Sequence, residues 1–131
     1  MITLKLPVYW TNVKKTKPNV THLFGMNWFR NAFFFSQNTA KKHFQKLIIE
    51  QLGTDPIKFT GKYKVTYTYH YKSRVSDLMN VTSMISKVVN DALQEVGVVV
   101  DDNVQYCIEE HCYVGERHKD DPHCIVVIEG V

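Results

Sequence analysis

Carboxylate side chains stand at both ends of one long segment, residues 77–102, which reads DLMNVTSMISKVVNDALQEVGVVVDD. Asp77 opens this segment, and the adjacent pair Asp101 and Asp102 closes it. Oxygen ligands of this kind bind Mg²⁺, which can activate water and offset charge on a leaving oxygen during phosphodiester cleavage. If the two ends fold back towards each other, the segment predicts a divalent-metal site, with Asp91 on the helix face that carries Asp77.

Between the acids, the sequence has the periodicity of an amphipathic helix. Ser76 or Asp77 is predicted to cap its start, and Gly97 fits the residue just beyond its end. Residues 98–100 then predict a short buried strand that delivers the closing aspartates. The competing interpretation is a capped helix whose polar residues are only solvated. The predicted core-facing residues are Leu78, Val81, Ile85, Val88, Val89, Ala92 and Val96.

The rest of the chain predicts an α+β fold with a small mixed β-sheet and two main helices. Alternating apolar residues predict strands at 2–6, 62–72, 104–114 and 123–129, of which the last two are expected to form a hairpin. Helical spacing predicts the second helix at 36–52. A length of 131 residues favours one domain, residues 1–131.

Composition narrows the classes of protein that fit. No run approaches the roughly 18 apolar residues of a membrane span, and the first residues lack the pattern of a signal peptide. Three cysteines, an odd count, fit a reducing cytoplasm rather than a disulfide framework. We therefore expect a cytoplasmic protein without a membrane partner.

Charge is distributed unevenly, although the net charge is only +3. Of the acids, only Glu50 and Asp55 precede Asp77, whereas most basic residues do. This asymmetry predicts a basic surface that contacts nucleic acid. Most aromatic residues between 28 and 35 are expected in the core, but Asn27 and Arg30 among them suit phosphate binding or base stacking. The candidate DNA-binding residues are Lys14, Lys15, Lys17, Asn27, Arg30, Lys62, Lys64, Lys72 and Arg74.

A second group of residues has the composition of a zinc site. None of its pairs has CxxC or HxxxH spacing, and Cys112 and Cys124 fall in predicted strands. A zinc-stabilised interaction protein is therefore the third interpretation of the chain, behind the two DNA-directed ones given below. The group comprises His111, Cys112, His118, Asp121, His123 and Cys124.

Three stretches, DLMN at 77–80, KVVNDAL at 87–93 and GVVVDDN at 97–103, resemble the RusA family of phage-type Holliday junction resolvases. The resemblance implies a small homodimeric endonuclease that uses Mg²⁺, or Mn²⁺, to cut branched DNA, the four-way junction, in recombination, repair or phage DNA processing. It also implies a bacterial or phage-infected cytoplasm. The implied catalytic residues are Asp77, Lys87, Asp91 and Asp102, and the implied metal ligands are Asp77, Asn80, Asp101 and Asp102.

Two features depart from the family pattern. Met79 stands where the family has a second acid, and the helix before Asp91 is about one turn longer. Either Asp91, Asp101 or Asn80 completes the metal site, or the chain binds junctions without cutting them. For the homodimer, Trp10, Trp28 and residues 33–35 are expected to leave an apolar patch.

Overall fold

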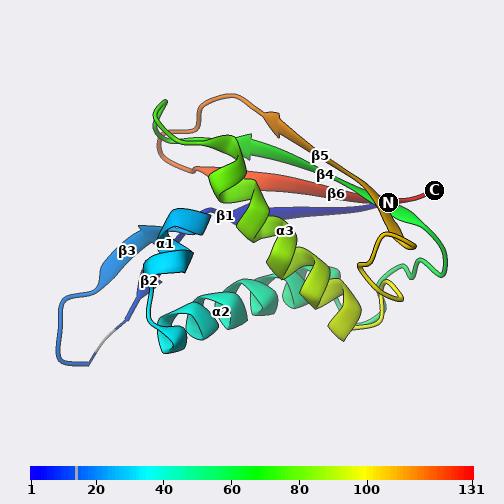
Figure 1. Ribbon diagram of the computed structural model, residues 1–131, viewed down its shortest axis with the longest axis horizontal. Coiled ribbons are helices and arrows are strands. Elements are labelled where there is room, and N and C mark those ends of the chain that lie inside the picture. The colour runs from blue at the N-terminus through cyan, green and yellow to red at the C-terminus, as the bar shows by residue number, and fades with distance from the viewer. Residues whose placement is uncertain (14) are drawn as a thin grey trace.

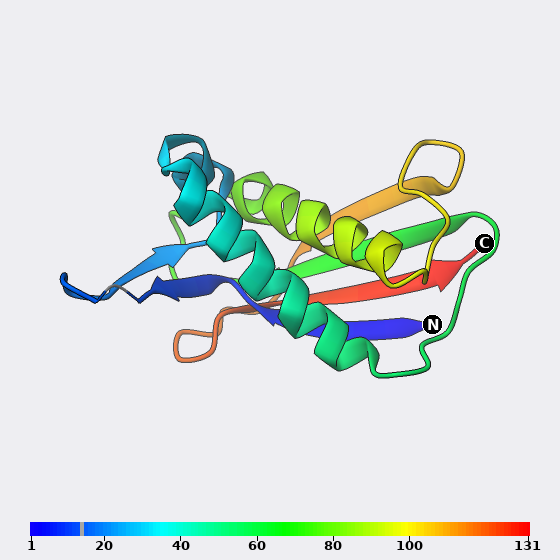
Figure 2. The same ribbon diagram turned by 90° about the horizontal axis from the view of Figure 1, so that it is seen from below.

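Two long helices cross one face of a four-stranded sheet, and the opposite face carries no helix (Figures 1 and 2). The computed structural model describes residues 1–13 and 15–131, so Lys14 lies outside the described residues. The sheet strands are β1 (Ile2–Pro7), β4 (Tyr63–His70), β5 (Cys107–Val114) and β6 (His123–Gly130). The helices are α1 (Met26–Asn31), α2 (Phe34–Leu52) and α3 (Leu78–Glu95), and β2 (Tyr9–Asn12) and β3 (Val20–Leu23) form a separate hairpin. This is the expected α+β fold with a mixed sheet, with one short helix added.

The strand order in the sheet is β1-β6-β4-β5. β4 pairs with β5 in parallel and with β6 antiparallel, so it lies between them. The predicted hairpin of the last two strands is therefore wrong. The connection from β5 to β6 instead crosses the end of β4, where Gly115 and His118 donate backbone hydrogen bonds to the carbonyls of Tyr69 and Tyr71, both at 2.9 Å.

Alternation along β4 follows the prediction. Tyr63, Val65 and Tyr67 are fully buried beneath the helices, and Tyr69 is 2% exposed. Thr66, Thr68 and the other intervening residues are half-buried on the helix-free face. Helices cover only one face of β4, so buried and half-buried residues alternate along it. This two-residue period is the pattern from which the strand was predicted.

Helix α3 begins and ends where the sequence predicts. The Asp77 carboxylate accepts a hydrogen bond from the backbone N–H of Met79 at 3.3 Å, and Gly97 has a φ of 75°. The predicted strand at 98–100 is wrong, however. The N–H of Val98 donates to the carbonyl of Leu93 at 2.9 Å, which closes the helix with a turn. The chain then remains in turns and bends until β5 begins.

Aromatic side chains divide between the core and the surface. Trp10 is 4% exposed, and Phe24 stacks on Phe44 with ring centroids 4.1 Å apart. Trp28 is half-buried and packs against the core. The expectation that the two tryptophans contribute to an exposed apolar patch is therefore wrong. Residues 33–35 are different, because all three phenylalanines are at least 68% exposed at the start of α2. The expectation that most aromatic residues between 28 and 35 lie in the core is therefore wrong. Of the residues expected to form an apolar patch, these three phenylalanines are exposed, and the homodimer itself stays a prediction.

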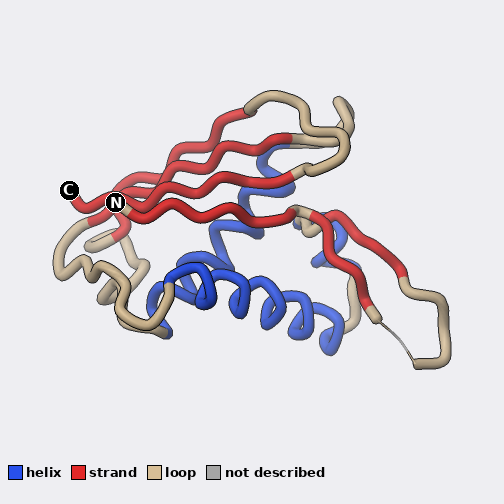
Figure 3. The backbone as a smooth tube through the Cα atoms, turned by 180° about the vertical axis from the view of Figure 1, so that it is seen from behind, coloured by secondary structure: helices blue, strands red, loops and turns tan. Residues whose placement is uncertain are grey.

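The β2–β3 hairpin extends beyond the sheet (Figure 3).

Within the described residues, none of the helices combines the length and the apolar character that crossing a membrane requires. Cys107, Cys112 and Cys124 are all free thiols.

Candidate functional site

Residues from α1 and from the start of α3 surround an open pocket of about 320 Å³. Asp77 and Asn80 line it from α3, and Asn27 and Arg30 line it from α1. Four of the residues predicted from the sequence thus meet, although about fifty positions separate the two segments. Met79, which stands where the family has a second acid, also lines the pocket, together with Met26 and Ser83, which the sequence did not single out.

Asn80 ties α1 to α3. Its Oδ1 accepts a hydrogen bond from the backbone N–H of Asn27 at 2.8 Å. This N–H is one of the unpaired donors of the first turn of α1, whose N-cap, Gly25, has no side chain to accept it. The observed role of Asn80 is therefore to hold α1, and with it Arg30, beside Asp77. That use of Oδ1 weakens its assignment as a metal ligand.

We expect Gly25→Ala to loosen this connection. An added Cβ at residue 25 would lie 2.5 Å from Nδ2 of Asn80, so the amide must move and release the N–H of Asn27. The predicted loss is about 1–2 kcal/mol of unfolding free energy, measured by urea denaturation. Gly61→Ala is the matched control, because a Cβ there meets nothing within 4 Å. Equal midpoints for both variants would contradict the assigned role.

Asp77 and Asp102 do not meet within one chain. Asp77 caps the start of α3, whereas Asp102 follows its end. The 18 residues of this helix span about 27 Å at 1.5 Å per residue. The expectation that both carboxylates bind one ion in a single chain is therefore wrong, because no strand returns from the end of the helix.

Asp101 and Asp102, which follow the far end of α3, have different roles. Asp101 is held by its neighbours, since Oδ1 accepts from Gln94 Nε2 and from the Asp102 N–H, both at 2.7 Å, and Oδ2 accepts from Asn103. It stabilises the turn after the helix, which disfavours metal binding by Asp101. Partial burial raises the pKa of Asp102, and its contact with Asp101 and the charges of Asp101 and Asp91 raise it further. The Asp102 carboxyl group therefore lies among other negative charges and keeps a proton more readily than an isolated aspartate does. Lys87 lies exposed on α3 between the two ends.

A polar network that the sequence did not reveal joins α3 to the sheet. The Glu110 carboxylate accepts from Tyr67 Oη at 2.7 Å, Ser86 Oγ at 2.8 Å and Asn90 Nδ2 at 3.0 Å. Tyr63 donates in turn to Asn90 Oδ1 at 2.7 Å. Burial, followed by the charge of Glu110, raises the pKa of Tyr67 far above its usual value, so its hydroxyl stays a donor. Alternating polarity on β4 predicted buried tyrosines but not their partners.

The candidate DNA-binding residues separate into groups. Lys15 and Lys17 lie exposed in the connection between β2 and β3. Lys72 and Arg74 lie exposed between β4 and α3, on the approach to Asp77. Lys62 and Lys64 lie at the other end of β4, and Lys64 pairs with Glu129 at 3.8 Å. The described part of the chain therefore presents these lysines and Arg74 at two ends rather than as one track.

The zinc-like group is also divided. His111 lies on β5 and pairs with Glu109 at 2.9 Å, whereas Cys124 is buried in β6. Burial raises the pKa of the Cys124 thiol to about 12, which disfavours the thiolate that metal binding requires. Of the six predicted residues, His118, Asp121 and His123 lie near one another. The ring centroids of His118 and His123 are 4.9 Å apart, and Asp121 Oδ2 lies 3.9 Å from His123 Nδ1.

The chain matches no protein-family model and no curated protein. The resemblance to the RusA family is therefore carried by the sequence stretches given above.

Proposed function

We propose that the protein is a RusA-like, Mg²⁺-dependent endonuclease that acts as a homodimer on four-way DNA junctions. The observation that carries the proposal is the pocket at the start of α3, where Asp77 meets Arg30 and Asn27. A guanidinium beside backbone and side-chain amides suits a DNA phosphate, and the carboxylate next to it suits a divalent cation.

The residues of one chain fit Mg²⁺ poorly. At the pocket, Asp77 is the one carboxylate, and Asn80 Oδ1 is already bonded. A second acid therefore has to come from elsewhere. When bound, Mg²⁺ supplies an activated water and stabilises charge on the leaving oxygen. Arg30 would hold the phosphate and Asp77 the cation.

A two-fold dimer can supply the missing acid. β5 is an edge strand, and its exposed side chains include Ile108, Tyr113 and Val114. Val114, at the end of β5, lines a pocket with Ser76 and Leu78, the two neighbours of Asp77. At the start of β5, the backbone N–H of Cys107 donates to the carbonyl of Asn103, which directly follows Asp101 and Asp102. Antiparallel pairing of two β5 edges would set the Asp102 loop of one copy beside the Asp77 pocket of the other. Each dimer would then hold two composite sites.

Junction binding without cleavage is the rival function. Met79 in the pocket, where the family has an acid, and the distance between Asp77 and Asp102 both favour it. It predicts tight, salt-sensitive binding and no nicking with either Mg²⁺ or Mn²⁺.

A junction assay with both metals tests the proposal. We expect two symmetric nicks by the wild type, and cleavage reduced to background by Asp77→Asn and Asp102→Asn with binding retained. Neutralising an acid near phosphate does not weaken the attraction for DNA. Glu50→Gln, at an exposed acid of α2, is the matched control and should cut normally. Binding by the wild type without any nicking would favour the rival, and full cleavage by both aspartate variants would overturn the site.

A further inference from the structure

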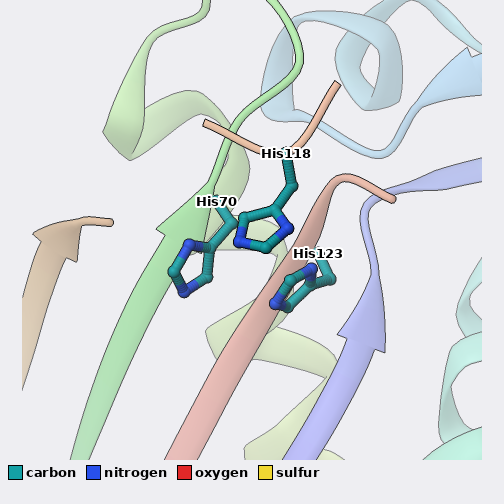
Figure 4. A group of neighbouring side chains, drawn as sticks. All are labelled: His70, His118 and His123. Carbon is teal, nitrogen blue, oxygen red and sulfur yellow. The ribbon is translucent and has the colours of Figure 1, made fainter. Parts of the chain in front are cut away.

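Three histidines from separate segments gather where β4 ends and β6 begins (Figure 4). His70 ends β4, His118 lies in the β5–β6 connection and His123 begins β6. One ligand atom from each lies within 4.8 Å of those of the other two. Among residues 1–13 and 15–131, no other group of three or more His, Cys, Asp or Glu residues meets in this way.

Hydrogen bonds fix two of the rings in the form that binds metal. Nδ1 of His70 lies 2.8 Å from the carbonyl oxygen of Glu116, and Nδ1 of His123 lies 2.6 Å from that of Asp121. A carbonyl oxygen only accepts, so each Nδ1 carries a hydrogen, and in the neutral imidazole Nε2 then has the lone pair that binds a metal. Metal-binding histidines are oriented by the same kind of second bond.

The backbone around the histidines is shaped to hold them. A Cβ on Gly115 would lie 2.5 Å from the His70 ring, so glycine lets the connection pass this close. The N–H of His118 donates to the Tyr71 carbonyl at 2.9 Å, which sets that residue over the end of β4. His123 is only 6% exposed, whereas His70 and His118 are partly open to solvent.

We propose that His70, His118 and His123 form a binding site for a divalent transition-metal ion, with zinc as the best fit. Three imidazole nitrogens with a fourth position left to water are a donor set that Zn²⁺ takes in proteins. Tetrahedral binding places each nitrogen about 2.0–2.1 Å from the ion. The three ligand atoms, which lie within 4.8 Å of one another, would therefore draw together around it. Mg²⁺ prefers oxygen ligands to imidazole nitrogens, so this site is distinct from the Mg²⁺ site proposed at Asp77. The bound ion would tie the β5–β6 connection to the ends of β4 and β6.

Cobalt titration of the untagged, chelator-treated full chain tests this proposal. We expect one Co²⁺ per chain, with the visible absorption of a four- or five-coordinate ion, displaced by Zn²⁺ and unaffected by Mg²⁺. His118→Asn should weaken binding by at least about 100-fold, since it removes one of three ligands. Gly115→Ala should weaken binding without removing a ligand, because it displaces the His70 ring. His111→Asn, at an exposed histidine on β5, is the matched control and should bind as the wild type does.

Circular dichroism and the melting temperature of each metal-free variant establish that it is folded. Absence of cobalt binding by the wild type, or equal affinity in folded His118→Asn, would overturn the proposal, as would loss of binding in His111→Asn. The titration needs neither DNA nor Mg²⁺, so its outcome is independent of the proposed nuclease activity.

Discussion

Mixing two inactive variants is expected to restore junction cleavage. If Asp77 of one copy and Asp102 of the other form each site, a heterodimer of Asp77→Asn and Asp102→Asn has one site with neither acid and one site with both. Random exchange in an equal mixture makes half of the dimers heterodimers, so about one quarter of the wild-type sites return. The measurement is nicking of a labelled junction after the two proteins are unfolded and refolded together.

The nicking pattern adds a second criterion. Each heterodimer has one working site, so it should nick one strand of a junction and rarely make the symmetric pair of cuts. Each variant refolded alone is the control and should stay inactive. No recovery in the mixture, with dimers present by light scattering, would mean that the two acids do not share a site. Activity that returned as symmetric double cuts would equally contradict the composite arrangement.

Asn90→Leu is expected to cause the largest loss of stability among the substitutions considered. Asn90 is 6% exposed and accepts from the hydroxyl of Tyr63, which is fully buried. Leucine has nearly the same size, so the cost comes from a hydroxyl left without a partner and from the lost bond to Glu110. We expect a decrease of about 2–4 kcal/mol in unfolding free energy, measured by urea denaturation.

A double-mutant cycle separates this mechanism from simple misfit. Tyr63→Phe removes the hydroxyl that Asn90→Leu leaves unpaired. The double variant should therefore lose less stability than the two single losses added together, by about 1–2 kcal/mol. Strict additivity would show that the Tyr63–Asn90 hydrogen bond does not account for the effect.

Local sequence patterns predicted where the helices and strands lie along the chain better than they predicted which elements lie side by side. The alternation on β4 and the helical spacing before Gly97 each report which face of an element is buried, so both elements were placed correctly. Strand order is a different property. β5 and β6 follow each other in sequence, which favours a hairpin, but β4 lies between them, and both β4 and β6 are interior strands of the sheet. Nothing in the period of a strand states which strands flank it.

The candidate site shows the same limit. Asp77 and Asn80 were predicted together on one helix, whereas their meeting with Asn27 and Arg30 was not predicted and depends on the hydrogen bond from the Asn27 N–H to Asn80. Residues 98–100 are three valines, which suit a strand and a turn equally. Because they form a turn, no strand brings Asp102 back along α3 towards Asp77. His70 was not grouped with His118 and His123, because only the crossing of the β5–β6 connection over β4 brings the three rings together.

The position of β6 has a consequence for how the chain folds. β6 lies between β1 and β4 and pairs with both, so that Ile2 stands opposite Ile128. β1 is synthesised before the other strands of this sheet, yet it has no sheet partner until residues 123–130 have been made. During translation the sheet therefore closes last at its earliest strand, and a ribosome stalled before β6 would expose two unpaired edges. Pairings this distant in sequence are expected to make folding slow, on the scale of milliseconds to seconds.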